Sequence, residues 1–151
     1  MNIIVIASDH AGFSLKEKIK DYLKKNRCAV KDLGTYSEES CDYPDFAASC
    51  ARAIAQKKYS RGIVICGSGI GVSITATKFA GVRAALCNNV EAARLSRQHN
   101  DSNVLALGAR FVNAALAKKI VKAWLETKFE GGRHARRLNK IKKIECQLRS
   151  S

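Results

Sequence analysis

Short apolar segments and amphipathic segments alternate along almost the whole chain, and this alternation constrains the fold more than any other feature. The strand-like segments cover residues 2–8, 28–34, 62–67, 82–87 and 103–108. The helix-like segments cover residues 14–26, 46–58, 71–80, 91–99 and 114–129. Parallel strands need crossover connections, and helices supply them on both faces of a sheet. We therefore predict an α/β fold with a Rossmann-like, doubly wound, five-stranded parallel sheet and helices on both faces.

Two details refine this expectation. The segment 28–34 has the weakest apolar pattern, which predicts a strand at an edge of the sheet. Asp45 directly precedes the helix-like segment 46–58, and aspartate is a preferred N-cap residue. The chain has 151 residues and no internal repeat, so we expect one domain over residues 1–151.

The last segment differs from the rest, because no strand follows it. Glu130-Gly131-Gly132 interrupts the preceding helical pattern, and a helical tail is predicted over residues 133–149. Its apolar stripe consists of Leu138, Ile141, Ile144 and Leu148. This stripe packs either on its own domain or on a partner subunit, and the sequence favours neither.

Charge and cysteine content limit the classes of function. The net charge of +14 favours anionic partners, whether nucleic acids or small phosphates. No apolar run approaches the roughly 18 residues that span a membrane, and the start MNIIVIASDH does not resemble a signal peptide. We therefore expect a cytoplasmic protein with no membrane partner. The six cysteines include no CxxC pair, so we expect reduced thiols and no zinc site.

A glycine-rich turn, GIVICGSGIGVS over residues 62–73, places a thiol at the end of a predicted strand. The pattern is GxGxG, and it follows the third strand, whereas the dinucleotide fingerprint is GxGxxG after the first strand. Val72 stands where the last fingerprint glycine would be. No GKS or GKT follows, which excludes a P-loop. Neither nucleotide motif explains this turn.

Cys66 lies where this turn begins, and ligands of open α/β sheets bind at the carboxyl ends of the strands. Free backbone amides there attract negative charge and favour a thiolate. Cys66 is therefore a candidate base or nucleophile, with loop amides that could hold an oxyanion. A cysteine that only fills the core is the alternative.

Further polar residues lie near other predicted strand ends. Asp9 and His10 follow the first strand, His99 and Asn100 precede the fifth, and Arg110 follows it. Each has a structural alternative, such as a helix cap or a surface charge, but together they could converge on Cys66.

Two arginines of the tail are also candidates. Arg133 and Arg137 are four residues apart, so they share one helix face, an arrangement that suits a phosphate. A solvated face is the alternative for this pair.

At these residues the chain resembles the ribose-5-phosphate isomerase B family. The matching blocks are SDHAGFSLK, DYPDFA, CGSGIGVSITATKFAGVRAALC, LSRQHNDSNVLALGAR and EGGRHARR, in the family's order. The resemblance implies interconversion of ribose 5-phosphate and ribulose 5-phosphate, in the non-oxidative pentose phosphate pathway, without a metal or an organic cofactor. The wider family also includes isomerases of six-carbon sugar phosphates.

The resemblance also implies roles for individual residues. Cys66 would be the base that moves a proton between C1 and C2, and His99 would open the sugar ring with help from Asp9. The backbone amides of the loop, which consists of Gly67, Ser68, Gly69, Ile70 and Gly71, would hold the enediolate oxygens. The Ser68 hydroxyl could assist. The remaining binding residues would be Asn100 for sugar hydroxyls, His10, Arg133 and Arg137 for the phosphate, and Arg110.

Two other classes of function compete with this prediction. A nucleic-acid-binding protein would explain the charge, but the chain has no recognition motif and its polar residues lie at strand ends. A cysteine hydrolase could use Cys66 and His99 but would leave the arginines unexplained. We therefore expect a sugar phosphate as the partner, no nucleic acid, and a homodimer, or a dimer of dimers, whose sites are shared between subunits.

Overall fold

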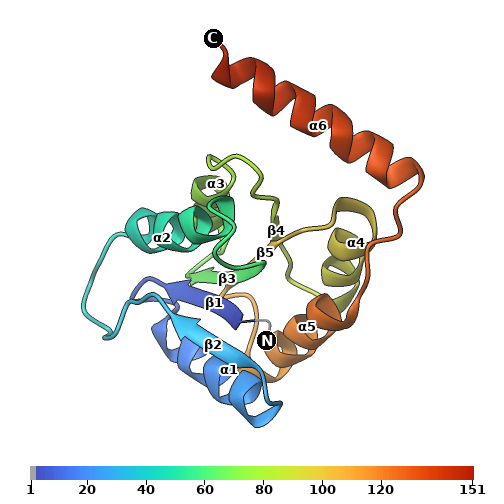
Figure 1. Ribbon diagram of the computed structural model, residues 1–151. Helices are drawn as coiled ribbons and strands as arrows, with labels where there is room; N and C mark the ends of the chain where they lie inside the picture. The colour runs from blue at the N-terminus through green and yellow to red at the C-terminus, as the bar shows by residue number, and fades with distance from the viewer. Residues whose placement is uncertain (1–2) are drawn as a thin grey trace.

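The computed structural model describes residues 3–151, which form five strands and six helices (Figure 1). The strands are β1 (Ile3–Ser8), β2 (Ala29–Asp32), β3 (Arg61–Cys66), β4 (Ala84–Leu86) and β5 (Val104–Gly108). The helices are α1 (Phe13–Lys25), α2 (Tyr43–Ala55), α3 (Ile70–Ala76), α4 (Val90–Asn100), α5 (Ala114–Glu126) and α6 (Arg133–Arg149). The predicted first strand also included residue 2, which lies outside the described residues.

All strand pairs are parallel, and the order across the sheet is β2-β1-β3-β5-β4. The predicted α/β class is confirmed, and β2 lies at an edge as its weak pattern indicated. From β1 the chain moves toward the β2 edge, whereas from β3 it moves toward the β4 edge. The sheet therefore has a topological switch point between β1 and β3, where ligands of such folds bind.

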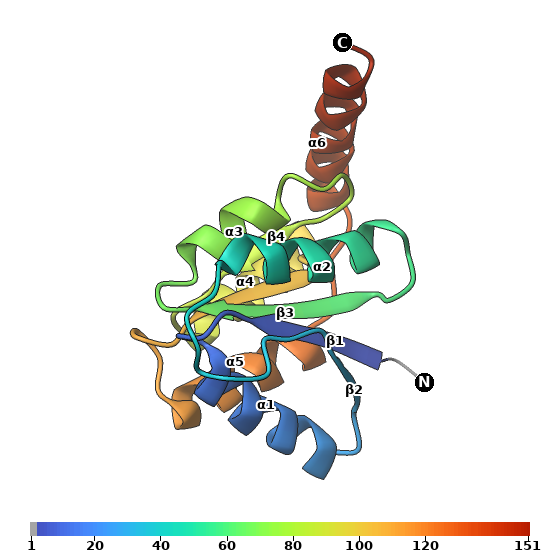
Figure 2. The ribbon, with the colours of Figure 1, turned by 90° about the vertical axis from the view of Figure 1, so that its left-hand side faces the viewer.

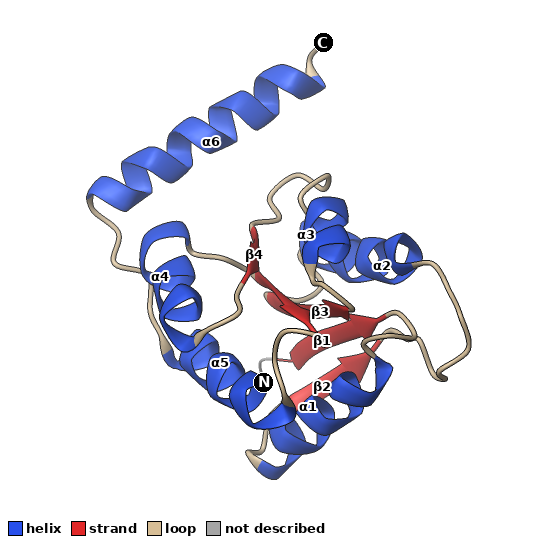
Figure 3. Ribbon diagram, turned by 180° about the vertical axis from the view of Figure 1, so that it is seen from behind, coloured by secondary structure: helices blue, strands red, loops and turns tan. Residues whose placement is uncertain are grey.

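Helices cover both faces of the sheet, as the strand pattern requires (Figure 3). Side chains of α1, α4 and α5 pack on one face, where Ile6, Ile63 and Leu105 are buried. Side chains of α2 and α3 pack on the other face, against Val5 and Val64. Successive strand residues alternate between the two clusters because side chains point to opposite faces. Both faces are apolar, so the strands read as nearly continuous apolar runs.

Several predicted boundaries shift, and one predicted cap is wrong. Helix α2 begins at Tyr43 rather than residue 46, Asp42 occupies the N-cap position, and Asp45 lies in the first turn. Pro44 explains the shift, because its fixed φ suits the first turn of a helix. Strand β4 contains only Ala84–Leu86 of the predicted 82–87, and α5 ends at Glu126 rather than 129.

A buried ion pair ties the end of β2 to α1. The Lys16 side chain is fully buried, and its Nζ donates to Asp32 Oδ1 at 2.7 Å. Lys20 Nζ donates to the other carboxylate oxygen at 2.6 Å. Burial opposes ionisation of Asp32, but the hydrogen bonds from Lys16 and Lys20 outweigh it and lower the pKa of this carboxyl. The segment after β2 is in turn bound to β1, since Thr35 N–H donates to Ser8 O at 2.6 Å.

Helix α6 stands apart from the rest of the structure (Figures 1 and 2). It covers the predicted tail, 133–149, and the side chains of Ile141, Ile144 and Leu148 are exposed by 48%, 56% and 73%. Toward the C-terminal end of α6, the Gly81 amide donates to the Glu145 carboxylate at 3.0 Å. The apolar stripe is therefore largely uncovered within one chain. Among the described residues, no helix is long and apolar enough to cross a membrane.

Candidate active site

The candidate base and the candidate carboxylate lie on adjacent strands. Cys66 is the last residue of β3, and Asp9 follows the last residue of β1. The two strands pair with Ser8 beside Ile65, and Asp9 N–H donates to Ile65 O at 3.2 Å. Both residues therefore lie at the switch point of the sheet, as predicted from the strand ends.

The Cys66 thiol is held inside the glycine-rich turn. The residue is 4% exposed, and its Sγ accepts a hydrogen bond from Gly69 N–H at 3.1 Å. An N–H donor directed at the sulfur is an arrangement that suits a thiolate. Burial raises the pKa of the Cys50 thiol to about 12 and that of the Cys87 thiol to about 11. Those two thiols are protonated at neutral pH and belong to the core.

The turn after Cys66 requires glycine at one position in particular. Gly69 has φ +76°, and a Cβ there would lie 2.5 Å from Leu86 Cδ1. This conformation directs the Gly69 amide back to the sulfur. Ser68 Oγ accepts from Ile70 N–H at 3.2 Å, so the hydroxyl faces the same turn. A loop of closely spaced amides next to a thiol can hold negative charge that develops on a substrate oxygen.

Asp9 and His10 are both fixed by backbone groups. Asp9 is 6% exposed, and its Oδ1 accepts from Gly12 N–H at 3.0 Å. His10 Nδ1 lies 3.1 Å from the backbone nitrogen of Cys41 and 3.2 Å from its carbonyl oxygen, so the backbone of Cys41 holds the ring at Nδ1. His10 therefore presents one defined ring nitrogen to a ligand.

Arg110 and Tyr43 complete this side of the sheet. Arg110 N–H donates to Gly67 O at 2.9 Å, and its exposed guanidinium lies over Gly67. The ring of Tyr43 packs against Gly71, where a Cβ would lie 2.5 Å from a ring atom. Sequence reasoning assigned no role to Tyr43, although it belongs to the quoted block DYPDFA.

We call these residues the carboxyl-edge group: Asp9, His10, Cys66, the loop Gly67–Gly71 and Arg110.

His99 and Asn100 do not join this group within one chain, so their predicted convergence on Cys66 stays a prediction for a site shared between chains. Both lie in the last turn of α4, which leads into the amino end of β5. The Asn100 carbonyl accepts from Arg83 Nε at 3.1 Å, and Arg83 precedes β4. They therefore lie at the opposite edge of the sheet from Cys66. Strand β5 runs from one edge to the other, and four steps of its rise separate the edges by roughly 13 Å.

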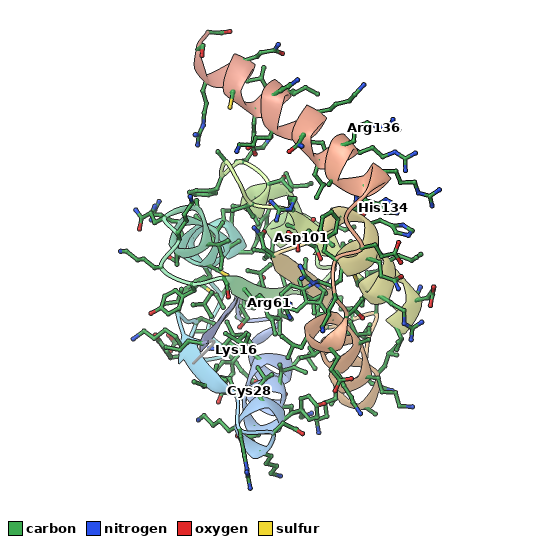
Figure 4. The ribbon with its side chains drawn as sticks, turned by 45° about the vertical axis from the view of Figure 1, so that its right-hand side comes forward. Lys16, Cys28, Arg61, Asp101, His134 and Arg136 are labelled. Atoms are coloured by element: carbon green, nitrogen blue, oxygen red, sulfur yellow. The ribbon has the colours of Figure 1, made fainter. Side chains whose placement is uncertain are left out.

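His99 instead contacts His134. His134 lies in the first turn of α6, where Figure 4 labels it. Their rings are stacked, with centroids 4.2 Å apart and planes inclined by 11°. His134 is only 5% exposed, and burial lowers the pKa of its imidazole. The charges of His99, Arg133 and Arg137 act in the same direction, whereas Glu130 opposes them. His134 is therefore neutral at pH 7. It lies in the block EGGRHARR, and only the three-dimensional contact reveals its relation to His99.

The predicted phosphate-binding arginines also lie away from Cys66. Arg133 and Arg137 are exposed in the first turns of α6, and Arg133 Nε lies 3.5 Å from His134 Nε2. The structure therefore brings the two arginines together with the histidine pair. We call these residues the amino-edge group: His99, Asn100, Arg133, His134 and Arg137.

The two groups have different chemistry. The carboxyl-edge group offers a thiol, a buried carboxylate and amide donors, which suit proton transfer beside a carbonyl. The amino-edge group offers an imidazole next to two guanidiniums, which suit acid–base work beside a phosphate. Neither group alone supplies the base, the oxyanion-binding amides, the ring-opening residue and the phosphate-binding residues that the sequence predicted.

Comparison with known proteins places this geometry in one family. The profile described as Ribose/Galactose Isomerase matches residues 4–141. The ribose-5-phosphate isomerase B of Escherichia coli (strain K12) is 50% identical over 145 residues, which are 96% of this chain and 97% of that protein.

Solved structures agree with this sequence match. The ribose-5-phosphate isomerase B of Clostridium thermocellum has a TM-score of 0.95 and 52% identity, covering 97% of this chain and 99% of its own. The enzyme of Mycoplasma genitalium, crystallised with bound ribulose-5-phosphate, has a TM-score of 0.91 and 46% identity, covering 95% of each chain.

Proposed function

This chain belongs to the ribose/galactose isomerase family, and we propose that it interconverts D-ribose 5-phosphate and D-ribulose 5-phosphate through a cis-enediolate. The observation that carries the proposal is the Cys66 thiol, which ends β3 at the switch point and accepts the Gly69 amide at 3.1 Å. The reaction would belong to the pentose phosphate pathway, and the cytoplasm is its predicted location.

The proton transfer uses Cys66 as the base. Its thiolate removes the proton from C2 of the open aldose, and the electron pair forms the C1–C2 double bond of the enediolate. The negative charge then lies on the sugar oxygens, where the amides of Gly67–Gly71 and the Ser68 hydroxyl donate. The thiol returns the proton to C1, and the O2 proton passes to O1 as the ketone forms at C2. This shuttle needs no metal or organic cofactor.

The substrate must be open before this step, since the furanose form has no carbonyl. We assign ring opening to His99, which exchanges a proton with the ring oxygen and O1, with Asp9 as its helper. Asn100 binds sugar hydroxyls, and His10, Arg133 and Arg137 bind the phosphate together with Arg110. The phosphate does not react, but binding it positions the carbon chain.

These assignments require two chains. Cys66 and His99 lie at opposite edges of one sheet, separated by roughly 13 Å along β5. In a two-fold homodimer, the amino-edge group of each chain can complete the carboxyl-edge group of the other. We propose this homodimer, alone or as a dimer of dimers, as the active form.

Uncovered apolar surface supports the homodimer. A cleft of about 440 Å³ lies between α6 and the β4 region, lined by Val82, Ala84, Ile141 and Leu148 among others. In α3 and in the segment after β5, the side chains of Ile74 and Phe111 are exposed by 55% and 61%. A monomer that left both surfaces in water would lose the stabilisation that their burial gives.

Isotope exchange tests the proposed chemistry directly. The chain is incubated with ribose 5-phosphate in D₂O, and proton NMR follows deuterium at C2 of the aldose and C1 of the ketose. We expect ribulose 5-phosphate to form with exchange at these carbons, and neither event in Cys66→Ala. Product formation by the variant at an unchanged rate would contradict the assignment of the base.

A further inference from the structure

One cluster of side chains combines His99 with two residues that have no role in the proposed reaction. Within residues 3–151, the ligand atoms of His99, Glu130 and His134 all lie within 4.8 Å of one another. They come from the last turn of α4, the linker before α6 and the first turn of α6. We propose that this cluster binds a divalent cation of the Zn²⁺ class, and that the bound cation inhibits the isomerase reversibly by occupying His99.

The donor set fits this class of cation. Two imidazoles and one carboxylate form a common set of protein ligands for Zn²⁺, with a fourth position left to water. Zn–N distances near 2.0–2.1 Å place tetrahedral ligand atoms roughly 3.4 Å apart. His134 Nε2 and Glu130 Oε2 are already separated by 3.4 Å. The exposed Glu130 and the half-buried His99 can supply the remaining movement by side-chain rotation.

Backbone contacts hold the three residues together in the absence of a cation. Glu130 N–H donates to Gln98 O at 3.1 Å, which fixes the linker to the end of α4. His134 N–H donates to Gly131 O at 3.0 Å, and its side chain is 5% exposed. The stacked ring of His99 lies on this anchored imidazole. Glu130 and His134 are therefore held in place before a ligand arrives, whereas the stacked ring of His99 must turn before its nitrogen can reach the same cation.

Positive charges nearby limit the affinity. Arg133 Nε contacts His134 Nε2 at 3.5 Å, a long hydrogen bond that the cation would replace. Arg137 is also close enough to influence His134, and the Glu130 carboxylate opposes both guanidiniums. A site of this kind binds and releases its cation, as an inhibitory site must.

The inhibition rests on the proposed function, because His99 is assigned to ring opening there. An imidazole whose nitrogen binds a cation cannot exchange a proton with the sugar. The cation would also displace Arg133 from His134, and so from its proposed place beside the phosphate. The cation is therefore expected to lower turnover of ribose 5-phosphate without taking part in the reaction.

Calorimetric titration with Zn²⁺ tests the site independently of activity. It is repeated with Ni²⁺, whose preference for imidazole separates this cluster from the free thiols. We expect one ion per chain, with affinity weakened about tenfold or more by Glu130→Gln and by His134→Ala. The matched control is His10→Ala, which removes the third histidine of the chain and is expected to leave binding unchanged.

The site would be overturned by no binding to the unmodified chain, or by equal binding to Glu130→Gln. The Glu130→Gln variant is needed because His134 is buried and its replacement could unfold the chain, whereas the Glu130 side chain is 49% exposed. Cation binding that is lost in His10→Ala instead would also overturn it.

The inhibition is measured separately, with EDTA to reverse it. Zn²⁺ should inhibit the unmodified isomerase, and Glu130→Gln should keep its basal turnover and resist the cation. Binding at the cluster without inhibition would overturn the inhibitory role. If the chain did not isomerise ribose 5-phosphate at all, the proposed function would fail, but the calorimetric result would still decide the site.

Discussion

The carboxyl-edge group and the amino-edge group are built in different ways. The carboxyl-edge group follows the ends of buried strands, where Cys66 and Asp9 are fixed by neighbouring backbone atoms. The amino-edge group combines a helix end with α6, which stands apart from the body (Figure 2). Under the proposed function this difference is a division of work: the first group would hold the reacting carbons in place, and the second would be presented to another copy of the chain.

Removing the thiol should have the largest effect. Cys66→Ala should reduce isomerisation by about 10²–10⁴-fold or more, because the general base is lost. Substrate binding, measured by calorimetry, should persist because the phosphate-binding residues remain. The matched control is Cys146→Ala, which removes an exposed thiol of α6. Activity of Cys66→Ala within about tenfold of the unmodified chain would show that the carboxyl-edge group does not supply the base.

Mixing two inactive variants tests whether the groups come from different chains. Cys66→Ala is combined with the double variant His99→Asn, Arg137→Ala, and subunits are allowed to exchange. With random exchange, half of the dimers are mixed and each has one intact site, so about a quarter of full activity should return. Mass spectrometry confirms the exchange. No recovery in an exchanged mixture would place both groups in one chain's site, and a monomer in light scattering would exclude sharing altogether.

Replacing the imidazole should separate ring opening from proton transfer. His99→Asn should lower turnover of saturating ribose 5-phosphate by about 10²–10⁴-fold, the usual contribution of an acid–base group. Turnover of saturating ribulose 5-phosphate should fall less, because this ketose cannot close a five-membered ring through its phosphorylated C5. Both rates are measured by rapid coupled assays. Equal losses in the two directions would assign His99 another role.

A smaller effect is expected on the stability of the fold rather than on catalysis. Asp32→Asn should lower the free energy of unfolding by roughly 2–3 kcal/mol at pH 7, because the buried Lys16 loses its charged partner. The pKa of Asp32 is lowered in the folded chain, so the stability it contributes is present at neutral pH and is lost as pH falls below its ordinary 3.8. Denaturant titrations at pH 7 and pH 3 should therefore show a smaller difference between the two proteins at pH 3. An equal difference at both pH values would contradict the role of this charge.

The sequence predicted the sheet well because its strands are buried on both faces and its helices are strongly periodic. It also predicted that Asp9 and Cys66 lie together, since both end strands of one parallel sheet. The predicted cap of α2 is wrong because Pro44 lies in the first helical turn, before the apolar pattern of this helix begins. Apolar periodicity cannot locate such a boundary within a few residues.

The position of His99 shows what linear pattern leaves out. A residue in the last turn of a crossover helix returns to the amino edge, whereas a residue after a strand leaves from the carboxyl edge. The expected convergence of His99 with Asp9 and Cys66 did not take account of the direction of the crossover helix. That direction follows from the predicted order of strands and helices. The stacking of His134 on His99 had no comparable signal, because α6 follows no strand and its path is set by tertiary contacts.

The length of β5 has a consequence for how the isomerase responds to dilution. Under the proposed arrangement, a lone chain holds two incomplete half-sites about one strand apart. Catalytic activity therefore depends on the concentration of the dimer, not on that of the single chain. Specific activity should then fall as the chain is diluted below the dissociation constant of the dimer, and substrate that bridges two chains should oppose that fall. The amount of protein made by a cell would set the number of sites and also the fraction of chains that work.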